Sequence, residues 1–176
     1  MEKMKMRLVA LISVLLSGCL GMPDGVKPVS DFELDNYLGT WYEVARLDHS
    51  FERGLSDVTA EYQLREDGGV QVINRGYNAE TGEWKQAEGK AYFVEESDKG
   101  YLKVSFFGPF YGSYIVFDLD KSGYQYAFVS GPNNDYLWLL ARQPNVDAKV
   151  IERFKNMSKE RGFDTSQLIF VEHSNQ

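Results

Sequence analysis

The chain has 176 residues, of which 26 are acidic and 19 are basic, and its formal net charge is −7. An acidic chain with no basic block argues against a nucleic-acid partner and against direct electrostatic attraction to anionic lipid. The length suffices for one domain with its own core, and the single cysteine argues against a disulfide, a thiolate metal site or a redox role.

The N-terminus predicts a lipoprotein signal. A basic start precedes an apolar run over residues 8–16, about half of the roughly 20 residues that a membrane-spanning helix needs. Leu16-Ser17-Gly18-Cys19 then matches the bacterial lipobox, whose cysteine is acylated before cleavage. We therefore expect a signal peptide over residues 1–18 and acyl chains on Cys19; the alternative is a secretory signal with a coincidental cysteine. Leu20 stands where an aspartate would retain a lipoprotein at the inner membrane, which favours attachment to the outer membrane, facing the periplasm.

Residues 19–30 mix glycine, proline and polar residues, and we expect them to form the lipidated N-terminus and a tether. The folded domain should cover residues 31–176. Within it, short β-type runs alternate with turns rich in glycine, asparagine, aspartate and proline. The runs cover residues 40–48, 57–65, 70–78, 84–95, 101–107, 113–119, 124–131 and 136–142. Eight consecutive strands with short links predict an all-β fold, either an eight-stranded antiparallel up-and-down β-barrel or a sandwich.

Alternation of side chains within these runs predicts an inner face. Ala87, Gly89 and Ala91 give this face small residues, which leave volume for a ligand unless Gly89 marks a bend. The aromatic residues of this face either line a cavity or fill the barrel as ordinary core. The side chains expected to point inward are Ala60, Tyr62, Val72, Asn74, Ala91, Phe93, Leu102, Val104, Phe106, Tyr114, Val116, Tyr126, Phe128, Tyr136, Trp138 and Leu140, whereas Leu137 and Leu139 should point outward.

Residues 146–161 change to the period of an amphipathic helix. Asn145 or Asp147 is the candidate N-cap, and Gly162 stands where the helix should end. A helix that follows eight strands packs against the outside of the sheet, and residues 168–171 predict a short final strand. The buried face of the helix is expected to consist of Val146, Val150, Ile151, Phe154 and either Met157 or Ser158.

Three short motifs resemble those of the lipocalin family. Gly39-Thr40-Trp41-Tyr42, at the start of the first strand, matches the family's Gly-X-Trp motif. Arg142 ends the eighth strand, where the family places an arginine that stacks on this tryptophan and closes the barrel. The middle motif survives only as Leu119-Asp120-Lys121, which keeps its aspartate. Longer stretches resemble the bacterial outer-membrane lipocalins; they cover residues 41–46, 51–54, 72–78, 105–112 and 135–138.

The resemblance implies a lipocalin calyx, an eight-stranded antiparallel up-and-down barrel with a C-terminal helix packed outside and a short final strand. It implies a binding protein rather than an enzyme, without cofactor or metal, that takes a fatty acid or lysophospholipid and serves lipid traffic or storage in the envelope. A homodimer is compatible with it. Gly39, Trp41, Asp120 and Arg142 would have structural roles. The residues expected to contact the ligand are Ala60, Tyr62, Val72, Asn74, Ala91, Phe93, Val104, Phe106, Tyr114 and Trp138.

Four loops should share the open end of such a barrel, namely 48–57, 78–84, 107–113 and 131–136. His49, Glu52 and Arg53 are the candidates there for contact with a lipid head group. The aromatic loop 107–113 predicts a lid, a membrane-touching edge or a dimer contact.

The sequence also leaves other functions open. The sequence contains no nucleophile elbow, zinc-protease motif, Cys/His cluster or P-loop. The alternatives are a haem ligated by His49, a lipid hydrolase with an unrecognised constellation, and a filled barrel that binds a partner through its loops.

Overall fold

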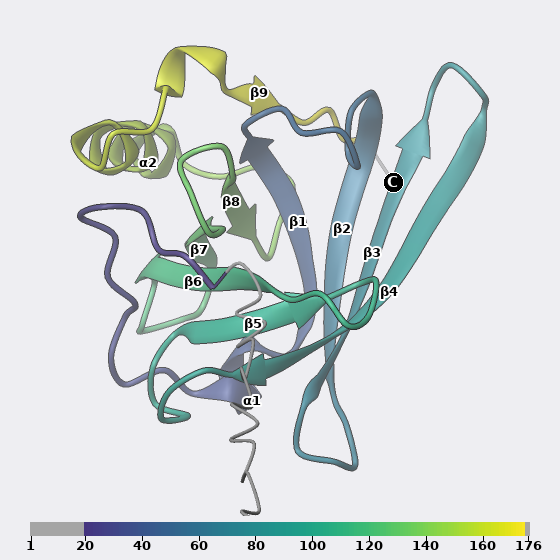
Figure 1. The fold of residues 1–176 in the computed structure, drawn as a ribbon. Coiled ribbons are helices and arrows are strands. Elements are labelled where there is room, and N and C mark those ends of the chain that lie inside the picture. Colours follow the sequence, from purple (N-terminus) through teal and green to yellow (C-terminus); the bar gives the residue numbers. More distant parts are fainter. Residues whose placement is uncertain (1–19, 175–176) are drawn as a thin grey trace, which may run out of the picture.

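The computed structural model describes residues 20–174, so the predicted signal peptide and Cys19 lie outside the described residues. Eight antiparallel strands form a closed barrel (Figure 1), in which each strand pairs with the next and β1 pairs with both β2 and β8. The strands are β1 (Gly39–Arg46), β2 (Leu55–Leu64), β3 (Val70–Asn78), β4 (Glu83–Phe93), β5 (Tyr101–Ser105), β6 (Gly112–Leu119), β7 (Tyr126–Ser130) and β8 (Leu137–Ala141). The predicted up-and-down barrel is confirmed, and each strand begins and ends within two residues of its expected bounds.

Two helices and a ninth strand complete the fold. Helix α1 (Leu34–Tyr37) lies at the closed end of the barrel, and α2 (Ala148–Glu160) packs outside it (Figure 1). The Asp147 carboxylate accepts a hydrogen bond from the Lys149 N–H and caps α2. After the 3-10 turn η1 (Thr165–Gln167), β9 (Ile169–Phe170) pairs with β1. Among the described residues, no helix is long and apolar enough to cross a bilayer.

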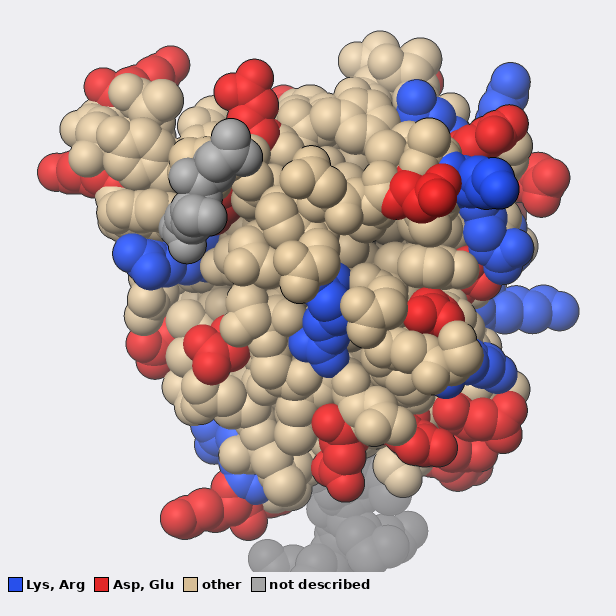
Figure 2. Space-filling model, turned by 180° about the vertical axis from the view of Figure 1, so that it is seen from behind, with Lys and Arg blue, Asp and Glu red and all other residues tan. Residues whose placement is uncertain are grey.

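The sheet separates two apolar clusters. The inner cluster fills the closed half of the barrel around Trp41, and the outer cluster lies between the sheet and α2 around Phe154. As expected, Leu137 and Leu139 of β8 belong to the outer cluster, whereas Leu140 belongs to the inner one. The face in Figure 2 shows acidic and basic side chains interspersed around a broad uncharged area, so the described residues give this face no field of a single sign.

The inward prediction for β7 is wrong. Ala127 and Val129 face the interior, whereas Tyr126 and Phe128 pack in the outer cluster. The Phe128 ring meets Phe154 of α2 edge-on, with 5.0 Å between ring centroids. Residues 126–129 are all apolar, so no polar side chain marks the outer face, and a β-bulge in β6 shifts the pairing with β7 by one residue.

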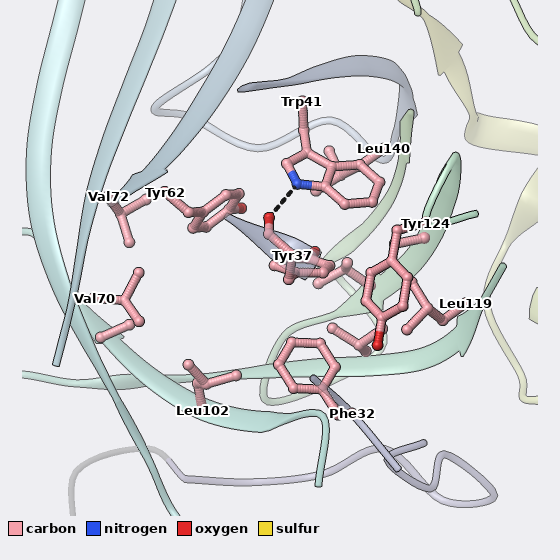
Figure 3. Packing of buried hydrophobic residues seen from close by; sticks show 14 residues of the cluster. Phe32, Tyr37, Trp41, Tyr62, Val70, Val72, Leu102, Leu119, Tyr124 and Leu140 are labelled. Atoms are coloured by element: carbon pink, nitrogen blue, oxygen red, sulfur yellow. Dashed lines mark hydrogen bonds between the residues drawn. The ribbon is translucent and has the colours of Figure 1, made fainter. Parts of the chain in front are cut away.

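The closed end is built around Trp41, which is fully buried (Figure 3). Its indole Nε1 donates to the Tyr37 carbonyl oxygen at 2.7 Å. The Arg142 guanidinium lies 4.0 Å from the centroid of the indole ring and donates to the carbonyl oxygens of Thr40, Asn36 and Leu38. Tryptophan, arginine and α1 therefore form a plug in which the indole N–H and the guanidinium donate to backbone carbonyl oxygens.

Gly39 and Asp120 also serve the closed end. Gly39 adopts φ +93°, a conformation that a residue with a β-carbon rarely takes. The Asp120 carboxylate accepts hydrogen bonds from Ser122 Oγ and from the Gln125 N–H, and so holds the turn between β6 and β7.

Residues 20–30, expected to be a tether, run along the outside of the barrel. Val26 is buried in the outer cluster. The Val29 N–H donates to the Val116 carbonyl oxygen, and the Val29 carbonyl accepts from the Gly100 N–H, both at 2.9 Å. Gly21 passes so close to Pro132 that a β-carbon would lie 2.5 Å from the Pro132 carbonyl oxygen. The apolar residues of this segment pack on the sheet, so the segment is not a free tether. Amino-acid composition alone does not predict this packing.

Candidate ligand-binding site

A cavity of about 700 Å³ occupies the barrel and extends to the loops opposite α1. Its wall consists mainly of apolar side chains from β2 to β6 and from β8. The structure places these predicted ligand contacts on the wall: Ala60, Tyr62, Val72, Asn74, Ala91, Val104, Phe106, Tyr114 and Trp138. Phe93 is not among the lining residues; it packs against Phe32, with 6.1 Å between ring centroids, at the closed end. Contact of the lining residues with a ligand stays a prediction.

The small residues of β4 have two different roles. Ala87 and Ala91 line the cavity. Gly89 does not, because a β-carbon there would lie 2.8 Å from Phe106 Cδ1 and 2.7 Å from the Ser105 carbonyl oxygen. The missing side chain of Gly89 therefore makes room for the Phe106 ring rather than for a ligand.

Three tyrosine hydroxyls meet in the interior. The Tyr114 hydroxyl lies 2.7 Å from that of Tyr37 and 2.8 Å from that of Tyr62, and all three residues line the cavity. Burial raises the pKa of each hydroxyl above its ordinary value, so the three stay neutral. Three hydroxyl protons serve two hydrogen bonds, so one proton remains to be donated to a third group.

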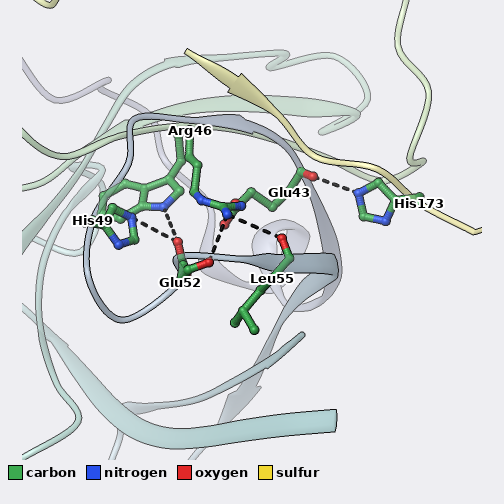
Figure 4. Close-up of polar contacts among 7 residues, drawn as sticks. Glu43, Arg46, His49, Glu52, Leu55 and His173 are labelled. Carbon is green, nitrogen blue, oxygen red and sulfur yellow. Dashed lines mark hydrogen bonds and ion pairs between the residues drawn. The ribbon is translucent and has the colours of Figure 1, made fainter. Parts of the chain in front are cut away.

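A buried polar network stands at the other end of the cavity, where β1 leads into the loop before β2 (Figure 4). Arg46 is 1% exposed, and it donates to Glu43 Oε1 at 2.7 Å and to the Glu52 carbonyl oxygen at 2.9 Å. Glu52 Oε2 accepts from Trp138 Nε1 at 3.1 Å and lies 3.0 Å from His49 Nε2. Both glutamates line the cavity.

The pKa values of the two glutamates are shifted in opposite directions. Burial, and then the charge of Glu52, raise the pKa of Glu43 well above its ordinary value despite the neighbouring Arg46. Burial also acts to raise the pKa of Glu52, but the bond to His49, the bond from Trp138 and the charge of Arg46 outweigh it and hold that pKa below its ordinary value. Glu52 is thus the anionic member, and it is matched by Arg46.

Some of these polar residues could be predicted from the sequence, and others could not. His49 and Glu52 were expected near the mouth, but Arg53, expected beside them, instead donates to Asp48 at 2.8 Å and is not a lining residue. Glu43 was not expected on the wall, although it follows the inward Trp41 by two positions, the period of a strand. Lys85 of β4 was also missed; it lines the cavity opposite Gly76 of β3.

The site can hold an apolar molecule and offer it hydrogen bonds near both ends. Among the described residues, no group of three or more histidine, cysteine or acidic side chains is placed to hold a metal ion. The geometry is that of a preformed pocket, mostly apolar with a few polar groups, and its volume falls within the roughly 300–1,000 Å³ of small-molecule sites.

Comparison with known proteins agrees with this geometry. A family model for lipocalin-like domains matches residues 32–173. The outer membrane lipoprotein Blc of Vibrio cholerae is 71% identical over 169 residues, which cover 95% of this chain and 99% of that protein. Outer membrane lipoprotein Blc of Escherichia coli K12 is 48% identical over 174 residues, covering 95% and 98%. Among solved structures, insecticyanin of the tobacco hornworm Manduca sexta superposes with a TM-score of 0.69 at 23% identity, covering 89% of this chain and 88% of that one.

The insecticyanin structure supports the fold, and the bacterial relatives support the location. Their similarity extends over nearly the whole chain and assigns this protein to the outer membrane, held there by a lipid anchor. The family consists in general of binding proteins for hydrophobic ligands, in agreement with an apolar cavity inside a closed barrel. From its sequence, its fold and its cavity alike, this chain belongs to the lipocalin family.

Proposed function

We propose that the barrel holds one acyl lipid, a fatty acid or a lysophospholipid, and stores or carries it in the periplasmic space beside the outer membrane. The observation that supports this most is the cavity of about 700 Å³, whose wall is mainly apolar and which reaches the loops of the open end. An acyl lipid is a common cellular molecule that has a long apolar chain and one polar end.

The energetics allow binding without any special contact. An acyl chain of about sixteen methylene groups gains at most roughly 13 kcal/mol on burial, at about 0.8 kcal/mol each. Association costs some 4–15 kcal/mol. Affinities from micromolar to nanomolar are therefore within reach of the chain alone, and selectivity among lipids depends on polar groups.

We place the lipid with its chain against the nine lining residues that the sequence proposed and its head group at the open end. Lys85 supplies a cation there, next to which a carboxylate or phosphate is stabilised. The tyrosine hydroxyls near the closed end are neutral and can donate only one hydrogen bond, so that half of the site supplies no positive charge for an anionic head group.

The test is native mass spectrometry with solvent extraction on the chain from Leu20 onward, secreted without its anchor. A stoichiometric fatty acid or lysophospholipid is the expected result. In Ala60→Trp the added ring enters the cavity, and we expect lysolipid affinity to fall at least about tenfold, equal to 1.4 kcal/mol. Gln63→Trp, on the exposed face of the same strand, is the control. A ligand-free mass together with no response to added acyl lipids would instead support a filled barrel that acts through its loops.

We further propose that residues 1–18 are removed, that Cys19 carries the acyl anchor, and that the lipocalin domain begins near residue 31. Cys19→Ala should block processing or release the protein from membranes. Unchanged fractionation with the outer membrane would contradict acylation at this residue. A homodimer in contact through the aromatic loop 107–113 is a second proposal for that surface, and the oligomeric state measured by light scattering tests it.

A further inference from the structure

The open end of the barrel exposes large aromatic side chains on three of its four loops. Phe107 and Phe110, between β5 and β6, are 80% and 70% exposed. Phe51, between β1 and β2, is 58% exposed, and Trp84, at the start of β4, is 44% exposed. The loop of residues 106–111 contains no charged residue. Rings of this size, gathered on one end and uncovered, mark a surface that meets another apolar phase.

The closed end has the opposite character. Its turns 65–69, 95–100 and 120–123 contain six carboxylates and three cations. Leu64 is the one large apolar side chain exposed beside these turns among the described residues. An acidic, hydrated end is repelled by an anionic lipid surface, so the two ends of the molecule differ strongly in their affinity for a bilayer.

The position of the N-terminal segment indicates which end faces the membrane. Gly21 lies against the carbonyl of Pro132, which belongs to the fourth loop of the open end and lines the cavity. The Leu20 carbonyl oxygen accepts from the Tyr101 hydroxyl at 3.4 Å, close to Ser113 at the start of β6. Leu20, the first described residue, therefore lies beside the open end, and a single peptide unit of about 3.8 Å separates it in the sequence from the proposed acylation site.

We infer that the open end of the barrel rests on the membrane that holds the anchor, with Phe107 and Phe110 inserted among the lipid head groups. Aromatic rings are favoured at this depth of a bilayer. The anchor and the aromatic loop then contact the same lipid surface, and the cavity opens onto it. The inference rests on the proposed acylation of Cys19 but not on the identity of the lipid in the cavity.

The experiment uses the full, lipidated chain in vesicles of phosphatidylethanolamine and phosphatidylglycerol. The acylated Cys19 has no free thiol, so one introduced cysteine can carry an environment-sensitive fluorophore. We place it at Phe110→Cys or Phe51→Cys on two loops of the open end, and at Ser122→Cys in a closed-end turn as the control. Lipids with a nitroxide on the acyl chain then quench any probe that reaches the bilayer.

We expect the probes at positions 110 and 51 to lose more than half of their emission and the probe at 122 to lose none. Quenching at 122 alone, at all three positions or at none overturns the inference. Emission at 110 that resists the nitroxide but shifts with protein density would identify a second copy as the occupant, and would also overturn it.

A second measurement tests the aromatic loop itself. With the probe at Phe51→Cys, the double change Phe107→Ser and Phe110→Ser should remove most of the quenching, whereas Leu64→Ser should leave it unchanged. Equal quenching in both backgrounds would contradict a role for the loop. Extraction of lipid from the same samples reports separately on the cavity, so an empty barrel with quenched probes would refute the proposed function and leave this inference standing.

Discussion

Trp41 is held from two sides, by the Arg142 guanidinium over its ring and by the Tyr37 carbonyl at its Nε1. Trp41→Ala removes a fully buried ring and leaves both partners without it, so we expect a loss of about 3–5 kcal/mol in the free energy of unfolding. Urea denaturation at constant pH measures this loss. A loss below about 1 kcal/mol would mean that the plug does not stabilise the barrel.

Trp84 provides a matched control for this prediction. The Arg75 guanidinium lies 4.1 Å from the centroid of the Trp84 ring, nearly the distance seen for Arg142 and Trp41, but Trp84 is 44% exposed. Because water already solvates much of this pair, Trp84→Ala should cost less than about 1 kcal/mol. Comparison of the two variants separates the burial of the ring from the contact with arginine.

Because of Glu43, the free energy of unfolding should fall as pH rises. Its pKa is raised in the folded protein, mainly by burial, so the folded state keeps a proton that the unfolded state has lost above the ordinary value of 4.5. Stability should therefore fall as pH rises from this value toward the raised pKa. Glu43→Gln lacks this titration, and we expect its unfolding free energy to fall less between about pH 5 and pH 8 than that of the parent chain. An identical pH profile for the two proteins would show that Glu43 is not the group responsible.

At the scale of elements, α2 is attached to the barrel by Phe154, which is fully buried against Phe128 on the outer face. Phe154→Ala should cost about 3–5 kcal/mol, as for other buried phenylalanines. Because Phe154 belongs to the outer cluster and does not line the cavity, lipid bound per folded molecule should not change. Chemical denaturation and lipid titration measure the two effects, and Phe170→Ala, at a ring that is 43% exposed, serves as the control.

The order of strands could be predicted from the sequence because residues typical of turns separate the strands. Gly68 and Gly82 adopt positive φ at the turns after β2 and β3, where the sequence placed hairpin residues. Asp147 and Gly162 likewise bound the helix as expected. These are local signals, in which the backbone conformation and the residue that prefers it coincide.

The faces of the strands could be predicted only where polar residues mark one side. In β2 the alternation of Ala60 and Tyr62 with polar neighbours placed both on the cavity wall. In β7, residues 126–129 are all apolar, and the orientation follows from the packing of Phe128 against α2 on the outside of the sheet. The positions of Gly89 and Phe93 likewise depend on Phe106 and Phe32, which approach from other segments and cannot be read from one strand.

For the whole molecule, the proposed ligand should contribute to stability. A lipid that binds the folded chain at a free concentration of about 100 times its Kd adds about 2.7 kcal/mol. For a domain of this size each kcal/mol raises Tm by roughly 2–4 °C, so delipidation should lower Tm by about 5–10 °C. Calorimetry before and after solvent extraction checks this, and addition of lysophospholipid should restore the original Tm. A Tm that is insensitive to extraction would mean that the cavity was empty.

The segment of residues 20–30 lies on the barrel instead of hanging free, which limits how far the protein can travel from its anchor. Eleven flexible residues would let the barrel wander roughly 18 Å from the point of attachment. The hydrogen bond between Val29 and β6 removes most of this freedom. With the proposed anchor on Cys19, this attachment would restrict the protein to lateral movement along one leaflet, where it would meet new lipids in two dimensions. Any exchange with a different membrane then requires that membrane, or a second carrier, to come to it.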